Sequence, residues 1–320
     1  QAALAIIDAL TGDVLALAGA PITGTASRKV PGFSWDANGS IGSVVKPFVL
    51  LEHLESERRG RPYMAVQDME VCGGHLDWRG LRLKCDDAHW DRGRDSIIAL
   101  SESCNVFFYQ AGLGLGTDGV ARALKRFGLV EPLDGDPFIE CWQPWVRGLP
   151  IVAPKVDEGI SLPRRSIGYG VEAPPLYLAR AYAGIATGVL PYVGLRLDRL
   201  QRFVQLGDIG ESLAVVRDGM AACVLTGTGR KLPMLKRLQV HAKTGTAEIS
   251  QRTKQNNGWF AGFMPWTGRG GMQIAFCAVV YNVPRGVHGG EAAGGMLVDF
   301  LRQLESKSLL NDRYLVPEDR

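Results

Sequence analysis

Several features that would decide the class of a protein at once are missing from this sequence. It contains no long apolar run, since the longest, from Ile274 to Tyr281, falls far short of the roughly 20 residues of a membrane-spanning helix. Its formal net charge is only +3, which is too small to indicate binding to nucleic acid. It shows no internal repeat and no low-complexity tract. We therefore expect a globular protein without a nucleic-acid partner.

Cysteine is also scarce, with six residues in a chain of 320, too few for a scaffold built on disulfides. Cys104, Cys223 and Cys277 lie in apolar runs and are predicted to be small core residues. The rest of the composition is ordinary, with 46% hydrophobic and 22% charged residues, as in most globular domains. A chain of this length can form one or two domains around a large core.

Strand patterns stand at both ends of the chain. Residues 2–8 and 14–18 are two apolar runs joined by Thr11-Gly12-Asp13, which predicts a β-hairpin. Because few natural chains begin within a core strand, we expect an upstream part of the protein that this sequence does not contain. The last third holds predicted strands at 239–245, 258–264 and 272–283, followed by a helix over 291–304.

The middle of the chain is predicted to be mainly helical, with irregular segments over 60–95 and 131–162. The predicted helices cover about 43–57, 96–102, 106–112, 120–127, 176–187 and 208–225. Strands at both ends with helices between them indicate an α+β fold, in which one five-stranded antiparallel sheet is flanked by the first and last helices. We expect a sheet lobe over about 1–50 and 235–305 and a mainly helical lobe over about 51–234.

The first motif with chemical meaning is Ser43-Val44-Val45-Lys46, at the start of the predicted helix over 43–57. A three-residue step along a helix brings Lys46 to the same face as Ser43. A serine hydroxyl then lies at the positive end of a helix, one turn from an amine that can take its proton. Ser-x-x-Lys occurs by chance in many chains, and a serine at a helix start is most often a cap, so this motif alone indicates little.

Two further motifs follow in order: Ser103-Cys104-Asn105 in a turn between predicted helices, and Lys243-Thr244-Gly245-Thr246 on a predicted strand. The series Ser-x-x-Lys, Ser-x-Asn and Lys-Thr-Gly on these elements is typical of penicillin-interactive serine enzymes. Ser43 would be the nucleophile. Lys46 would be its base, provided that partial burial and a nearby cation such as Lys243 lower the pKa of the Lys46 amine.

The other motif residues suit a substrate. Ser103 could relay a proton to a leaving amine, and Asn105 could orient the substrate and Lys46. Lys243 and the hydroxyls of Thr244 and Thr246 suit a substrate carboxylate. Gly245 allows close backbone approach at the strand edge. The backbone N–H groups of Ser43 and Thr246 would form an oxyanion hole.

Over nearly its whole length the chain resembles the transpeptidase domain of class B penicillin-binding proteins. Besides the three motifs, the similar stretches are Ala5-Ile6-Ile7-Asp8 with Thr11-Gly12-Asp13-Val14-Leu15-Ala16, Arg126-Phe127-Gly128-Leu129, Ser166-Ile167-Gly168-Tyr169-Gly170, Gly227-Thr228-Gly229 and Trp259-Phe260-Ala261-Gly262-Phe263. The run Phe107-Phe108-Tyr109-Gln110 is most similar to the cell-elongation members, the penicillin-binding protein 2 group. The chain departs from the family at Ala173-Pro174-Pro175 and over residues 250–257.

This resemblance implies the penicillin-binding protein and serine β-lactamase fold, and a D,D-transpeptidase that requires no cofactor. Ser43 would take the acyl group of a D-Ala-D-Ala stem peptide, and an amine of a neighbouring stem would complete a peptidoglycan cross-link. β-Lactam antibiotics would acylate Ser43 and remain. The family also implies a bacterial periplasmic or extracytoplasmic location, with an upstream membrane anchor and pedestal domain. A membrane glycan polymerase and other elongation-complex proteins would be partners of the full-length protein.

Two other functions are compatible with the same motifs. A serine β-lactamase would deacylate rapidly, and no glutamate stands in a setting that suggests a deacylating base, although a carboxylated Lys46 would leave no trace in the sequence. A non-catalytic β-lactam sensor or scaffold domain is the other, and the intact Ser43, Lys46 and Lys243 argue against an inactive scaffold.

Cys72 and Cys85 differ from the other cysteines because they flank the polar stretch Gly73-Gly74-His75-Leu76-Asp77. A disulfide between them fits an extracytoplasmic domain. A structural Zn²⁺ is the second interpretation, with candidate ligands Cys72, Cys85, Asp86 or Asp87, and His89. The third is a pair of thiols in a loop, with neither bond nor metal.

Overall fold

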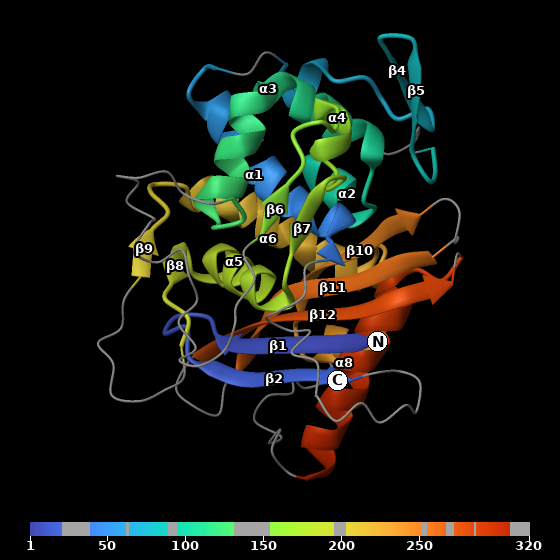
Figure 1. The fold of residues 1–320 in the computed structure, drawn as a ribbon. Helices are drawn as coiled ribbons and strands as arrows, with labels where there is room; N and C mark the ends of the chain where they lie inside the picture. Colours follow the sequence, from blue (N-terminus) through green and yellow to red (C-terminus); the bar gives the residue numbers. More distant parts are fainter. Residues whose placement is uncertain are drawn as a thin grey trace, which may run out of the picture.

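The computed structural model describes residues 1–20, 39–61, 64–88, 95–130, 154–194, 203–250, 255–266, 272–284 and 286–307. No helix in these ranges is both long and apolar enough to cross a membrane. The α+β fold predicted from the sequence is confirmed, with a sheet at one end of the molecule and helices at the other (Figure 1).

One five-stranded antiparallel sheet joins the two ends of the chain, in the order β10-β11-β12-β1-β2. Its strands are β1 (Ala2–Asp8), β2 (Val14–Ala20), β10 (His241–Ser250), β11 (Gln255–Trp266) and β12 (Met272–Pro284). The opening hairpin pairs with the last strand, Ala5 standing opposite Cys277. The predicted sheet is therefore confirmed. β1 has its predicted bounds and β10 begins two residues later than predicted, while β10 and β11 both extend into polar residues that still pair.

Alternate residues of the sheet enter two separate cores. On β1, Ala5 and Ile7 face the core shared with α5 (Pro175–Thr187), whereas Leu4 and Ile6 face the core shared with α8 (Gly289–Ser306). Figure 1 shows α8 across one face of the sheet and the helical lobe over the other. Because both faces are covered, the strands carry continuous apolar runs instead of an alternating pattern.

The helical lobe is built around α1 (Lys46–Arg58) and α3 (Asn105–Arg126). Besides α5, the other helices described in this part of the chain are η2 (Val66–Asp68), α2 (Ser96–Ser101), α4 (Leu162–Arg165), α6 (Gly210–Leu225) and α7 (Pro233–Arg237). Short strands complete it: β3 (Gly39–Ser40), β6 (Lys155–Val156) and β7 (Val171–Ala173) form one sheet, and β8 (Val189–Pro191) pairs with β9 (Phe203–Gln205).

Two helices predicted as separate form the single element α3. The helix is interrupted by a kink at Gly116, whose φ of +70° and ψ of 177° are not helical. Only glycine adopts this backbone conformation without strain, so the two predicted segments remain distinct helical pieces on either side of it. The predicted helix over 176–187 is confirmed as α5, and it ends at Gly188 with a φ of +81°.

The segment over 60–95, predicted to be irregular, contains a β-hairpin of β4 (His75–Trp78) and β5 (Leu81–Lys84). This prediction was wrong because the turn is not marked by the usual Asn-Gly. Arg79 and Gly80 instead take positive φ values of +47° and +77°, as a tight two-residue hairpin turn requires. The hairpin matters for the site, since Cys85 directly follows β5.

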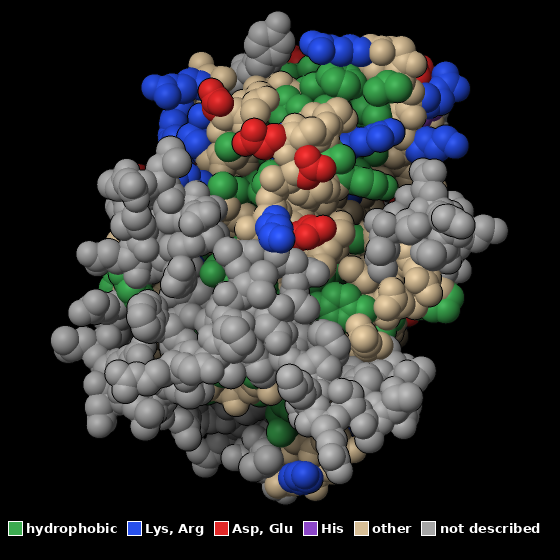
Figure 2. All heavy atoms as spheres, in the orientation of Figure 1, with side chains coloured by type: hydrophobic (Ala, Val, Ile, Leu, Met, Phe, Trp, Pro, Cys, Tyr) green, Lys and Arg blue, Asp and Glu red, His purple; other side chains and the backbone are tan. Residues whose placement is uncertain are grey.

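A buried carboxylate ties α1 to α3. Glu52 is 1% exposed and accepts hydrogen bonds from Arg122 at 3.1 Å and from Arg126 at 3.0 Å. Both cations come from the last turns of α3, so this pairing holds the two helices at a fixed register. Figure 2 shows Lys and Arg side chains over the helical lobe, with Asp and Glu among them.

Candidate active site

Ser43 lies in a short 3₁₀ turn, η1 (Gly42–Val45), which leads directly into α1. The predicted helix is thus confirmed from Lys46 onward, while Ser43 sits one tighter turn before it. Two buried side chains of the surrounding core hold this turn and the strand before it. The Tyr182 hydroxyl donates to the carbonyl oxygen of Val44 at 2.8 Å, and the Trp259 indole N–H donates to that of Ser40 at 2.8 Å.

Glycine lets η1 and β10 approach each other closely. A Cβ on Gly245 would lie 2.9 Å from Cγ1 of Val44 and 3.1 Å from the carbonyl oxygen of Ile41. Across the same contact, Gly42 has a φ of +53°, and a Cβ there would lie 2.9 Å from the carbonyl oxygen of Thr246. These two glycines bring the Ser43 motif against the Lys243 motif without an intervening side chain.

Lys46 is fully buried, and its amine contacts the second motif. Nζ donates to the Ser103 carbonyl oxygen at 2.7 Å, to Ser103 Oγ at 3.0 Å and to Asn105 Oδ1 at 2.6 Å. Ser103 itself has a φ of +59°, in the left-handed region that a serine seldom occupies. The amine therefore holds a strained turn in which the serine carbonyl and hydroxyl both face it.

The two motif lysines share one buried environment. Burial, followed by the positive charge of Lys243, lowers the pKa of Lys46 to about 7. Burial also lowers the pKa of Lys243 to about 8, against the opposing effect of Cys223 and of the carboxylates of Asp86 and Glu102. Near neutral pH, Lys46 is thus available in part as a neutral amine while most of Lys243 remains a cation. The Lys243 amine donates to the carbonyl oxygen of Thr244 at 2.9 Å.

A cleft of about 1230 Å³ is lined by residues of both lobes. The residues of the three motifs that line it are Ser43, Ser103, Asn105, Thr244 and Thr246. Lys46 and Lys243 are fully buried beside it, and Gly245 lies at the contact between β10 and η1. All three motifs therefore meet at one cleft. Sequence reasoning did not single out Tyr182 or Thr228, although the latter lies in a stretch that was noted for its family resemblance.

The sequence matches the family model of the penicillin-binding protein transpeptidase domain over residues 2–296. The chain belongs to this family. A curated relative, penicillin-binding protein 3 of Bacillus subtilis (strain 168), is 27% identical over 183 residues. That match covers 52% of this chain and 25% of the relative, so the transpeptidase chain spans about a quarter of that protein's length.

Solved structures share the fold of this transpeptidase domain. The apo transpeptidase domain of Burkholderia pseudomallei penicillin-binding protein 3 is 20% identical, with a TM-score of 0.72, and the match covers 97% of this chain and 89% of that one. Penicillin-binding protein 2 of Helicobacter pylori, solved in complex with MreC, is 19% identical with a TM-score of 0.77, over 97% of this chain and 61% of that one. Mycobacterium tuberculosis penicillin-binding protein 3 with aztreonam gives 18% identity and a TM-score of 0.70, over 95% and 73%.

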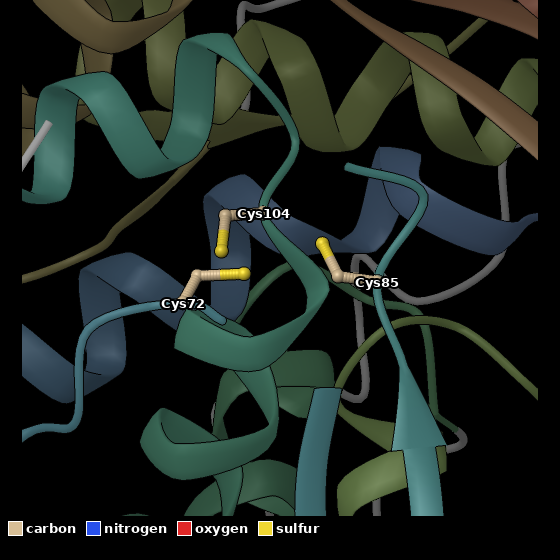
Figure 3. Close-up of side chains that lie close together, drawn as sticks. All are labelled: Cys72, Cys85 and Cys104. Atoms are coloured by element: carbon tan, nitrogen blue, oxygen red, sulfur yellow. The ribbon is translucent and has the colours of Figure 1, made fainter. Parts of the chain in front are cut away.

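Beside the second motif of the transpeptidase site, three cysteine thiols face one another (Figure 3). The sulfur atoms of Cys72, Cys85 and Cys104 lie within 4.8 Å of one another, and none of the three forms a disulfide. The expected Cys72–Cys85 disulfide is therefore wrong for this structure. Cys104, predicted to be a plain core residue, is indeed buried, but the left-handed turn at Ser103 directs its sulfur at the other two.

This thiol cluster fits a zinc ion better than the predicted ligand set does. Three thiols within 4.8 Å can reach one tetrahedral ion with Zn–S bonds of about 2.3 Å. The pKa of Cys85 falls below the usual thiol range, because Cys104 and the backbone N–H groups of Asn105 and Val106 donate to its thiolate. Asp86 is not in the cluster and instead lines the cleft, and His89 lies outside the described residues.

Proposed function

We propose that this chain is a serine-type D,D-transpeptidase that cross-links peptidoglycan. Ser43 would attack the carbonyl of the penultimate D-Ala of a stem peptide, release the terminal D-Ala and pass the acyl group to an amine of a neighbouring stem. The observation that carries this proposal is the buried Lys46 amine, held by Ser103 and Asn105 at the cleft that Ser43 lines. The family supports the class of reaction, acyl transfer. The arrangement of Lys46, Ser103 and Asn105 supports the proposed proton transfers.

Lys46 would act as the base. In its neutral form, the amine can donate one N–H to the Ser103 carbonyl and one to Asn105 Oδ1, which leaves its lone pair for a hydroxyl proton. It would take the proton of Ser43 as the acyl bond forms. Ser103, whose Oγ lies 3.0 Å from the same amine, would then carry that proton to the departing D-Ala nitrogen.

The third motif would bind the substrate. Lys243, Thr244 and Thr246 supply a cation and two hydroxyls for the terminal carboxylate of the stem peptide. Thr246 Oγ1 already accepts a hydrogen bond from the backbone N–H of Gly289 at 3.0 Å, so its own proton remains available to a ligand. The backbone N–H groups of Ser43 and Thr246 would bind the oxyanion, where losing one donor costs about 3 kcal/mol of transition-state stabilisation.

Intact-protein mass, followed over hours after mixing with benzylpenicillin, tests this proposal beside Ser43→Ala. A single lasting adduct that Ser43→Ala does not form is expected. An adduct that disappears within seconds while the penicillin is consumed would instead identify a serine β-lactamase. Release of D-Ala from a D-Ala-D-Ala peptide, and its transfer to an added amine, separates the transpeptidase from a β-lactam sensor that only acylates.

We further place the domain outside the cytoplasm, in the penicillin-binding protein 2 group of elongation enzymes, with the sheet lobe and helical lobe as parts of one transpeptidase domain over 1–320. The likeness to the H. pylori protein solved with MreC supports elongation-complex partners for the full-length protein. The family resemblance implies that a membrane anchor, a pedestal domain and a glycan polymerase would complete the assembly. Localisation and complementation of an elongation-defective strain by the full-length protein test this assignment.

Cys72, Cys85 and Cys104 would hold a structural zinc ion. The bound ion would fix the start of α3, because Cys104 caps that helix and the Asn105 N–H donates to Cys85 Sγ at 3.2 Å. Elemental analysis of the purified protein should give close to one zinc per chain, lost in Cys85→Ala and retained in Cys223→Ala, whose cysteine is buried elsewhere. Protein without zinc, whose three thiols all react with a maleimide, would contradict this site.

A further inference from the structure

Thr228 lies where the third motif meets the segment before the second motif. It occupies the turn after α6, and its backbone N–H donates to the carbonyl oxygen of Ser101 at 3.2 Å. The preceding glycine allows this contact, since a Cβ on Gly227 would lie 2.3 Å from the same oxygen. The turn therefore packs directly on the end of α2, two residues before Ser103, and Thr228 itself lines the cleft.

The hydroxyl of Thr228 is placed among three polar atoms. Its Oγ1 lies 2.6 Å from Thr244 Oγ1, 3.2 Å from Cys223 Sγ and 3.4 Å from the Ser101 carbonyl oxygen. The first contact is the shortest and is typical of a strong O–H···O bond. Because each hydroxyl has a single proton, the donor in this pair decides where the proton of Thr244 points.

Thr244 itself is held in place on its other side. Its methyl group packs against α8, where a Cβ on Gly290 would lie 2.7 Å from Thr244 Cγ2. The side chain is 8% exposed and lines the cleft. With its methyl group against α8 and its oxygen against Thr228, Thr244 has one orientation, and only its proton can change direction.

We propose that Thr228 is a positioning residue that aims the Thr244 proton at the substrate carboxylate. Thr228 donates to Thr244 Oγ1 at 2.6 Å in preference to the Ser101 carbonyl oxygen, which could accept the same proton but lies at 3.4 Å, and the Cys223 thiol can donate to Thr228 in turn. Thr244 is then an acceptor from Thr228 and keeps its own proton for the carboxylate in the cleft. Each bond in this chain polarises the next, which strengthens the last one. This inference rests on the proposed function, because it concerns how the carboxylate of the substrate that acylates Ser43 is recognised.

The test compares Ser43 acylation by benzylpenicillin, which carries a carboxylate, with acylation by its methyl ester, which does not. The rate constants are measured from intact-protein mass in wild type, Thr228→Val and Thr228→Ser. Thr228→Val removes the hydroxyl and keeps the shape, and it should slow benzylpenicillin about tenfold while the ester changes less than about twofold. Thr228→Ser keeps the hydroxyl and should restore the wild-type ratio of the two rates.

Thr226→Val is the matched control, because Thr226 also lines the cleft but its hydroxyl donates to the carbonyl oxygen of Ala222 at 3.2 Å. It should leave the ratio unchanged. Equal slowing of both compounds by Thr228→Val would show a merely structural role, and no slowing of either would show no role; both overturn the proposal. If the wild type is not acylated at all, the proposed function fails instead. Thermal unfolding of each variant, with Thr228→Ala as a second hydroxyl-free variant, separates misfolding from these outcomes.

Discussion

The pair of buried lysines makes a quantitative prediction about pH. With the pKa of Lys46 at about 7, about a tenth of the amine is neutral at pH 6 and about three quarters at pH 7.5. If neutral Lys46 is the base, acylation should rise roughly eightfold between these pH values. Lys243, whose pKa is about 8, loses its charge above that pH, so the rate should fall again and the profile should be a bell with a maximum near pH 7.5.

The variant Lys243→Gln shows which lysine is responsible for each limb of the bell-shaped pH–rate profile. The falling limb should disappear, because the titrating cation is gone, and acylation should be slower throughout. The rising limb should move to higher pH, because Lys243 contributes to lowering the pKa of Lys46. It should stay below the usual lysine range, since burial is the larger cause.

The assay is the second-order rate constant of Ser43 acylation by benzylpenicillin from pH 5.5 to 9.5 at fixed ionic strength. Far-UV circular dichroism across the same range checks that the fold persists. A wild-type rate that does not change between pH 5.5 and 7.5, or a rising limb in Lys243→Gln at the same pH as in wild type, would refute the coupling of the two amines.

Three further predictions concern the frame of the site. Gly245→Ala should lower the free energy of unfolding by about 1–3 kcal/mol and suppress acylation, since its Cβ would lie 2.9 Å from Val44 Cγ1; denaturant titration measures the first effect, and normal stability would contradict the packing argument. Tyr182→Phe removes the bond to Val44 and should cost about 1 kcal/mol in the same titration, with slower acylation; an unchanged acylation rate would show that Ser43 does not depend on this anchor. The Tm of Lys46→Met should exceed that of wild type by more at pH 6 than at pH 9. The native amine has a lowered pKa, so the cost of keeping it protonated is fully present below pH 7 and declines as pH rises; an equal Tm difference at both pH values would count against the lowered pKa.

The sequence could predict the parts that local patterns dictate. The runs that became β1, β12 and α5 are long and uniform, and the glycine after α5 marks its end. The order of the three motifs was sufficient to expect one shared cleft, but the 3₁₀ turn at Ser43 could not be foreseen, because it depends on contact with β10, far along the chain.

What escaped prediction depends on backbone angles and on neighbours distant in sequence. Cys104 stands in an apolar run, so nothing local distinguishes it from a core residue; only the left-handed Ser103 directs its sulfur at Cys72 and Cys85. The Arg79-Gly80 hairpin lacks the usual turn signal. The contact between Thr228 and Thr244 joins the turn after α6 to strand β10, which no periodicity connects.

The pairing of β1 with β12 has a consequence for how the protein is made. β1, an inner strand of the sheet, is synthesised well before its partner β12, which is completed only at Pro284. Contacts this distant in sequence close slowly, because the entropy of a long loop must be overcome before they form. During synthesis the hairpin of β1 and β2 remains unpaired with β12, and its apolar faces stay exposed, until β12 has been made. The active site needs β10 of the same sheet against the turn at Ser43, so reactivity toward β-lactams should appear only at the end of folding and can serve as a sensitive report that folding is complete.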